Sequence, residues 1–385
     1  MRRLIVPLLA AALCAAPVQA ARETLPLPPF TTAYQPTTVD ERGLWMEADE
    51  DERRMRDAPE VIRDPALNAY AREVLCRTVG PVRCAAIRLY IVRIPMFNAT
   101  TYANGMMTLW SGALLRLHSE AELAAMFGHE FSHFELRHTL TGFQRRRSGS
   151  DLLAWAGLLG AGGIALPTMV VGGFYRFSRA QEAAADMLGF RYLTAAGYVV
   201  TAPADLWTRV MAEQDATEIG RYRKPNQRYV AGFFDTHPTE LTRATYLRAA
   251  AAQIGGGGVD EAARFRAAIA PWLPRLLDDQ IKRNDFGGSE YLLNQLAVDG
   301  WTTPLLFARG ELYRERGNPR DLSAAAGFYR EAITHGDAPA EAYRGLGLAL
   351  LRSGQVEAGK AALRDYLARR ADAGDAAMIA TLIAG

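Results

Sequence analysis

The spacing of apolar residues along the first third of the chain predicts helices and strands. Residues 40–56 and 65–78 have a helical pattern of apolar positions, which predicts two helices. Residues 87–92, IRLYIV, alternate and are rich in β-formers, which predicts a strand. Residues 97–110, FNATTYANGMMTLW, predict two more strands that turn at Asn104-Gly105, a dipeptide common in hairpins.

Two later stretches begin with helix-capping signals. Ser119, with Glu122 three residues later, forms a capping box that opens SEAELAAMFGHEFSHFELRH. Ser178, with Gln181, forms a second box that opens SRAQEAAADMLGFRYLTAAG. Gly197 is typical of a helix end. We therefore expect two capped helices in this part of the chain.

The last third of the chain is predicted to be helical and partly repetitive. Four glycines at 255–258 mark a linker. The matching positions beyond it are Gly310 with Gly347, Tyr313 with Leu350 and Gly317 with Gly354 at an offset of 37 residues, and Tyr329 with Leu363 at an offset of 34. This pattern resembles the tetratricopeptide (TPR) repeat. A plain helical bundle is the alternative, because such arrays normally need about three units.

The first twenty residues set the expected compartment. Arg2 and Arg3 precede an apolar run, and Val18-Gln19-Ala20 has the small-residue pattern of a cleavage site. We expect residues 1–20 to be a secretory signal that is cleaved after Ala20. Cleavage removes two arginines and no acid, so the 44 basic and 42 acidic residues become equal in number. This balance argues against a nucleic-acid partner.

Cys76 and Cys84 are the cysteines that remain after this cleavage. An oxidising compartment favours a disulfide between them, which is worth about 2–3 kcal/mol. Two buried free thiols are the alternative. The length of the chain and its 49% hydrophobic residues suit two domains with buried cores.

Residues 128–138, GHEFSHFELRH, contain three of the six histidines. Successive residues of a helix are about 100° apart, so His133 lies about 40° from His129 and both imidazoles can bind a single metal ion. Glu130 is offset on the same side, where it can contact a water bound to that metal. His138 falls on the opposite face of a continuous helix, so we expect it to be a packing or hydrogen-bonding residue.

This spacing is the H-E-x-x-H pattern of zinc peptidases, in which the glutamate acts as general base on a zinc-bound water. A catalytic zinc site needs a third protein ligand. The second capped helix offers Glu182 and, four residues later, Asp186 on the same face. We predict that Glu182 is the third ligand and that Asp186 orients a ligand histidine.

Together these motifs resemble family 48 of the zinc metallopeptidases, the HtpX/BepA-like peptidases, over roughly residues 65–250. The matching positions are Asn98-Ala99 to Asn104-Gly105, Glu122-Leu123-Ala124-Ala125, GHEFSH with His138, Arg179 with Glu182 and Asp186, and Thr236-His237-Pro238 with Arg243. The signal sequence and the TPR-like tail make the periplasmic BepA-type branch the nearest match.

The resemblance implies an α+β fold that is mainly α. Residues 21–254 would form a zincin-like protease domain with a small β-sheet, and residues 259–385 a helical TPR-like domain. One zinc ion per chain would be bound by three ligands with one nearby base. The ligands are His129, His133 and Glu182, and the base is Glu130.

The resemblance also implies residues around the metal. His237 and Arg243 would lie near it, where they stabilise the oxyanion or, for His237, cap the open site. Asn98, Ala99 and Thr100 would bind an extended substrate along an unpaired strand edge. Threonines in this stretch depart from the more apolar residues expected of the family, which affects the expected subsite preference rather than catalysis.

A charge-free run, residues 152–175, separates the two capped helices. It is long enough to span a bilayer, but it contains six glycines and Pro167. The preferred interpretation is an apolar hairpin that packs over the active site or makes a peripheral membrane contact, and a spanning helix is the alternative.

These observations predict a secreted, periplasmic zinc endopeptidase that degrades unfolded or misassembled proteins. The TPR-like region would recruit a partner, and the family likeness implies outer-membrane assembly machinery. The alternative is a TPR-based assembly chaperone or adaptor whose zinc site stays latent.

Overall fold

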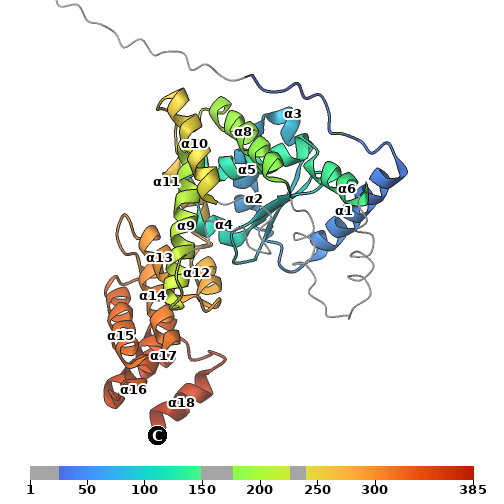
Figure 1. Ribbon diagram of the computed structural model, residues 1–385. Coiled ribbons are helices and arrows are strands. Elements are labelled where there is room, and N and C mark those ends of the chain that lie inside the picture. The colour runs from blue at the N-terminus through green and yellow to red at the C-terminus, as the bar shows by residue number, and fades with distance from the viewer. Residues whose placement is uncertain (1–25, 149–176, 226–239) are drawn as a thin grey trace, which may run out of the picture.

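The computed structural model describes residues 26–148, 177–225 and 240–385, and this part of the chain is mainly helical with a small sheet (Figure 1). Its first elements are α1 (Val39–Asp57), α2 (Pro65–Val79), α3 (Pro81–Cys84), β1 (Arg88–Val92), β2 (Ala99–Thr101), β3 (Met106–Trp110) and α4 (Ser111–Arg116). The next helices are α5 (Glu120–Glu135), α6 (His138–Ser148), α8 (Arg179–Ala195), α9 (Ala202–Gly220) and α10 (Glu240–Ile254). The last are α11 (Ala262–Ile269), α12 (Leu273–Ile281), α13 (Phe286–Leu296), α14 (Thr303–Arg316), α15 (Pro319–Thr334), α16 (Ala340–Arg352), α17 (Val356–Arg369) and α18 (Ala376–Ala384).

The three strands lie in the order β1-β3-β2, so β2 is an edge strand. β1 is parallel to β3, and β2 is antiparallel to it. The predicted hairpin turn is confirmed: Gly105 has φ 88°, and a Cβ there would lie 2.4 Å from the carbonyl oxygen of Ala86. Only glycine fits a backbone with that φ so close to another carbonyl.

The sheet is covered on both faces because its side chains alternate. Met107 and Leu109 of β3 belong to the main core with α2 and α5, whereas Met106 packs with Ala48 and Met55 of α1. α5 therefore lies against one face of the sheet and α1 against the other.

Cys76, in α2, and Cys84, at the end of α3, form a disulfide with their Cα atoms 4.9 Å apart. The predicted pairing is therefore the one present, and it closes the turn between these two helices.

The two capped helices form where they are predicted, with one difference at each end of the first. Ser119 accepts from the Glu122 amide, but the Glu122 carboxylate accepts from the amide of His118, so the box is half formed. α5 also ends at Glu135 and does not continue to His138. The box at the start of α8 is complete.

The main hydrophobic core continues across the glycines at 255–258. Val259 pairs with Tyr198, and the side chain of Phe265 in α11 is buried in the same cluster as those of α2 and α5. Leucines of later helices join that cluster, namely Leu276, Leu277, Leu292, Leu293, Leu305 and Leu312. The predicted domain boundary between residues 254 and 259 therefore does not separate two hydrophobic cores.

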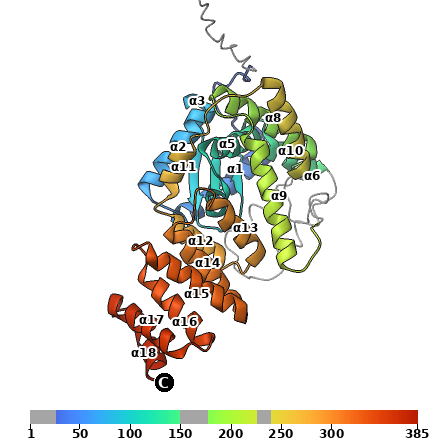
Figure 2. The same ribbon diagram turned by 90° about the vertical axis from the view of Figure 1, so that its left-hand side faces the viewer.

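The last helices pack as successive hairpins, α14 with α15 and α16 with α17, and they extend away from the sheet (Figure 2). A Cβ on Gly310 would lie 2.7 Å from the ring of Tyr329, and a Cβ on Gly347 would lie 2.6 Å from Leu363. These are equivalent positions of the sequence repeat, so both hairpins use the same close helix contact. The TPR assignment itself remains a prediction.

Within the described ranges, every helix is too short or too polar to cross a bilayer. The predicted signal sequence at 1–20 and the charge-free run at 152–175 lie outside those ranges.

Candidate active site

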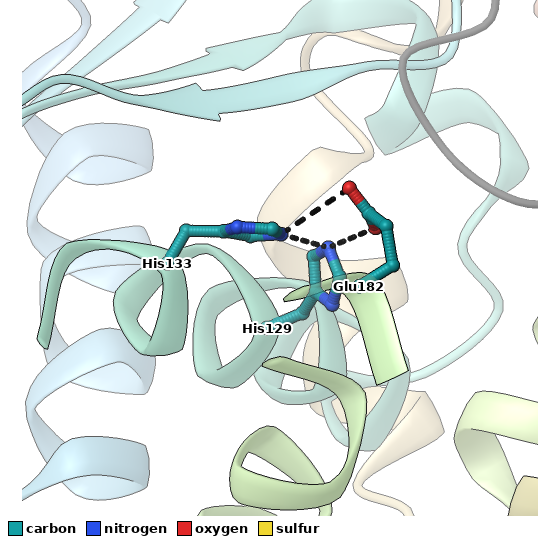
Figure 3. Close-up of side chains that lie close together, drawn as sticks. All are labelled: His129, His133 and Glu182. Atoms are coloured by element: carbon teal, nitrogen blue, oxygen red, sulfur yellow. Dashed lines mark hydrogen bonds and ion pairs between the residues drawn. The ribbon is translucent and has the colours of Figure 1, made fainter. Parts of the chain in front are cut away.

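The histidines of α5 and Glu182 of α8 point toward one another (Figure 3). The Nε2 atoms of His129 and His133 are 3.1 Å apart. Oxygens of Glu182 lie 3.6 Å from Nε2 of His129 and 3.7 Å from Nε2 of His133. All three residues are buried, and their ligand atoms lie within 4.8 Å of one another. The structure therefore brings the predicted ligand set together.

These donors fit a zinc ion. Atoms bound about 2.0–2.2 Å from zinc at the corners of a tetrahedron are about 3.3 Å apart. The separations of 3.1, 3.6 and 3.7 Å are close to that spacing. Two imidazoles and one carboxylate also match a catalytic zinc site, in which one position is left open.

Asp186 contacts His129, the first predicted ligand, as its place on α8 predicts. Its Oδ1 lies 2.8 Å from Nδ1 of His129, which leaves Nε2 for a metal. Burial opposes the charged form of Asp186, but the Arg243 guanidinium and His129 hold the pKa of that carboxyl well below its usual range. Burial, and then the charge of Arg243, lower the pKa of His129 to about 3. His129 is therefore neutral, as a zinc ligand must be.

Arg243 of α10 lies behind His129. Its Nε and Nη2 donate to Asp186 over 2.8 and 2.5 Å, and its Cζ lies 3.9 Å from the ring centroid of Trp207. Only 1% of the residue is exposed. The structure thus places Arg243 near the ligands, as expected, but gives it a contact with Asp186 that the motif did not predict. His237 lies outside the described residues.

Glu130 is buried beside the ligands. Its Oε2 lies 3.4 Å from Oγ1 of Thr101, the last residue of β2. Burial, and then the charge of Glu182, raise the pKa of Glu130 well above its usual range. A carboxylate with a raised pKa accepts a proton more readily. The position and the pKa both suit the predicted base.

His138 is not on the far side of α5, and the expectation that it faces away from His133 is wrong. Arg137 has φ 55°, so the chain turns between α5 and α6. Nδ1 of His138 then lies 3.0 Å from Nδ1 of His133. The part of the expectation that made His138 a hydrogen-bonding residue is confirmed.

The predicted substrate stretch follows the sheet edge closest to α5. Asn98 precedes β2, and its carbonyl accepts from the amide of Trp110. Ala99 and Thr100 pair with β3 on one side, and Thr100 also contacts the Thr108 hydroxyl at 2.7 Å. Because β2 is the last strand in the order, its other side has no strand partner among the described residues.

Three contacts at the site were not predicted from the sequence. Thr101 contacts Glu130, Trp207 covers Arg243, and the hydroxyl of Tyr246 donates to Asp186. Tyr246 follows Arg243 by three residues on one helix face, and this spacing could have indicated that both residues contact the same partner. Trp207 lies on α9 and carries no local signal of its role.

Residues 85–251, which include all of these positions, match the family model described as peptidase family M48. A Vibrio cholerae protein named for a beta-barrel assembly-enhancing protease is 30% identical over 51% of this chain. The mitochondrial metalloendopeptidase OMA1 of Schizosaccharomyces pombe is 29% identical over 45%, and the metalloprotease LoiP of Escherichia coli is 30% identical over 39%. The chain spans about half the length of these curated relatives, namely 43%, 50% and 57%.

Proposed function

We propose that this chain, which carries a domain of peptidase family M48 over residues 85–251, is a zinc-dependent endopeptidase. One observation carries the proposal: two histidines of α5 and one glutamate of α8 present three zinc donors within 4.8 Å, and Glu130 follows His129 directly on α5. This arrangement has a base next to an open metal position, which peptide hydrolysis requires.

The residues of the chain divide the chemistry between them. Zinc on these ligands supplies a Lewis acid that polarises a carbonyl and lowers the pKa of water. Glu130 accepts the proton of the attacking water and returns it to the amine that leaves. Asp186 holds His129 in one orientation throughout, and burial of the site keeps bulk water away from the transferred proton.

The proposed substrates are unfolded or misassembled proteins. The edge strand β2 offers backbone groups to an extended chain, and Thr101 at its end contacts Glu130. A folded protein rarely exposes a strand that can pair in this way, so an edge next to the base favours unfolded chains.

The proposed place of action is the periplasm, in quality control of envelope proteins. The Cys76–Cys84 disulfide suits an oxidising compartment. The Vibrio relative's name refers to beta-barrel assembly, which supports a partner in outer-membrane assembly. The hairpins of α14 to α17 are the proposed surface for that partner.

The second candidate is an assembly chaperone or adaptor with a latent zinc site. The repeated helical hairpins favour it, because stacked hairpins form surfaces that bind peptides. An adaptor needs no working base, so the two candidates differ in whether function requires the carboxylate of Glu130.

The test compares the full chain with Glu130→Gln on an unfolded test protein. We expect the wild type to cleave it, a chelator to stop cleavage, and Glu130→Gln to retain zinc without cleaving. Cleavage by the variant at the wild-type rate would refute the base. Zinc in both proteins with cleavage by neither would favour the adaptor.

A further inference from the structure

The second zinc-ligand histidine has an imidazole partner of its own. Nδ1 of His133 lies 3.0 Å from Nδ1 of His138, and both residues are buried. In Figure 3 this nitrogen of His133 points away from His129 and Glu182. The contact is therefore on the side of the ring that faces away from the metal position.

The turn between α5 and α6 creates this contact. On a continuous helix His138 would lie about 140° round the axis from His133. Arg137 instead has φ 55°, an uncommon conformation for a residue with a side chain. Its guanidinium lies 4.7 Å from the ring centroid of Tyr34, which helps to hold the turn.

The protons on the two rings follow from the geometry. Nε2 of His133 faces the Nε2 of His129 and an oxygen of Glu182, so it needs a lone pair for the metal. Nδ1 of His133 therefore carries the hydrogen and donates it. Nδ1 of His138 accepts it, so the proton of the neutral His138 ring is on Nε2.

His138 is itself held in place from the other ligand helix. Gln181 of α8 donates from Nε2 to the carbonyl oxygen of His138 over 3.4 Å and to Oγ1 of Thr141 over 2.9 Å. Gln181 precedes the third ligand, Glu182. The start of α8 and the start of α6 are thus tied at the residue next to a ligand.

The ring of His133 has little freedom to turn. Phe177 stacks on it with the ring centroids 4.0 Å apart and the planes 22° apart. A stacked ring still needs a hydrogen bond to select its tautomer, and His138 supplies the acceptor.

We propose that His138 is a positioning residue for zinc: its Nδ1 accepts from His133 and thereby directs Nε2 of His133 to the metal. The inference rests on the ligand set of the proposed function. His138 would thus orient His133 in the same way that Asp186 orients His129, through a contact with Nδ1. A neutral acceptor here, in place of a second carboxylate, adds no further negative charge to a site that already contains Glu130, Glu182 and Asp186.

The test replaces His138 in the full chain and measures zinc affinity by competition with a chromogenic chelator. His138→Phe keeps an aromatic ring but has no acceptor, and we expect about 10–100-fold weaker zinc binding. His138→Asn restores an acceptor near the place of Nδ1 and is expected to recover most of that loss. His335→Phe, at an exposed histidine far along the chain, is the matched control and should bind zinc as the wild type does.

The unfolding temperature of the zinc-free proteins separates positioning from packing. We expect His138→Phe and His138→Asn to unfold at similar temperatures without zinc although their zinc affinities differ. Equal zinc affinity in His138→Phe and the wild type, with zinc lost in His133→Ala, would overturn the inference while the proposed function stands.

A spectroscopic measurement on the wild type does not depend on how the variants fold. In the zinc form with 15N-labelled histidine, we expect a scalar coupling between Nδ1 of His133 and Nδ1 of His138 across the hydrogen bond. A protonated Nδ1 on His138 would overturn the inference, because that nitrogen would then be unable to accept.

Discussion

Gly128 of α5 and Gly189 of α8 lie directly against one another where the two helices that carry the proposed zinc ligands cross. A Cβ on Gly189 would lie 2.7 Å from the amide nitrogen of His129, and a Cβ on Gly128 would lie 3.0 Å from the carbonyl oxygen of Gly189. The backbones meet at the first ligand itself. We expect this close approach to set the distance between His129 and Glu182.

Gly189→Ala should therefore separate the ligand helices. The obstructing atoms are backbone, so the helices have to shift, and we expect a loss of about 1–3 kcal/mol in the free energy of unfolding together with weaker zinc binding. Denaturant unfolding of the zinc-free protein and a chelator competition measure the two effects.

Gly327→Ala is the matched control, since a Cβ at this exposed position of α15 meets nothing within 4 Å. It should stabilise the protein by about 0.5–1 kcal/mol. Unchanged zinc affinity in Gly189→Ala would show that the crossing does not set the ligand distance.

Arg243→Met should destabilise the protein more than an ordinary surface change. It leaves the carboxylate of Asp186 buried without its guanidinium, which costs about 3–5 kcal/mol. Arg243→Met combined with Asp186→Asn removes both charges and should regain part of that loss. Urea unfolding measures both variants.

An oxyanion role for Arg243 gives a different pattern. The unfolding free energy of Arg243→Met would then stay near that of the wild type, and kcat alone would fall. Stability and turnover measured on the same preparation therefore distinguish a clamp on Asp186 from a contact with the substrate.

A chain that ends at Gly258 should fail to fold, whereas one that ends at Gly317 should fold and bind zinc. The shorter chain lacks Phe265 and Leu277, and each such side chain contributes about 1.5–3 kcal/mol when buried. The free energy lost with all of the core leucines of α12 to α14 exceeds a typical stability of about 5–15 kcal/mol. Circular dichroism and zinc content give the result, and a cooperative unfolding transition for the shorter chain would contradict it.

Stability should fall between neutral and mildly acidic pH because of His118. Burial, and then the charges of Arg209 and Arg266, lower the pKa of His118 from 6.5 to about 4. Above pH 6.5 neither state binds the proton; as the pH falls from 6.5 toward 4, the unfolded chain binds it first and stability is lost. At pH 5 the loss is roughly 1–2 kcal/mol.

His118→Gln removes this proton and serves as the comparison. The difference in unfolding free energy between the variant and the wild type should change by that amount between pH 7.5 and pH 5. Parallel pH profiles of the two proteins would show that His118 titrates normally in the folded state.

Several parts of this protein follow from the sequence because they depend on residues close together in the chain. The i, i+4 spacing puts His129 and His133 on one face of any helix, and Ser119 and Ser178 start their helices through bonds within one turn. The Asn104-Gly105 turn is local in the same sense.

Other parts are decided only when distant segments pack. Whether Glu182 reaches the histidines depends on how closely α8 crosses α5, and the contact of Arg243 with Asp186 depends on where α10 lies. His138 differs from the sequence prediction because that prediction assumes a continuous helix through Arg137, where the chain turns.

The glycines at 255–258 illustrate the same limit on a larger scale. They indicate a break in secondary structure, which is local, but not which core the helices beyond them join. Helical period and turn preference act over a few residues, so the sequence by itself determined the helix that carries His129, Glu130 and His133 and the serines that cap the two helices. The distance from Glu182 to the histidines, the contact of His133 with His138 and the shared core depend on long-range packing, and the tertiary structure decided them.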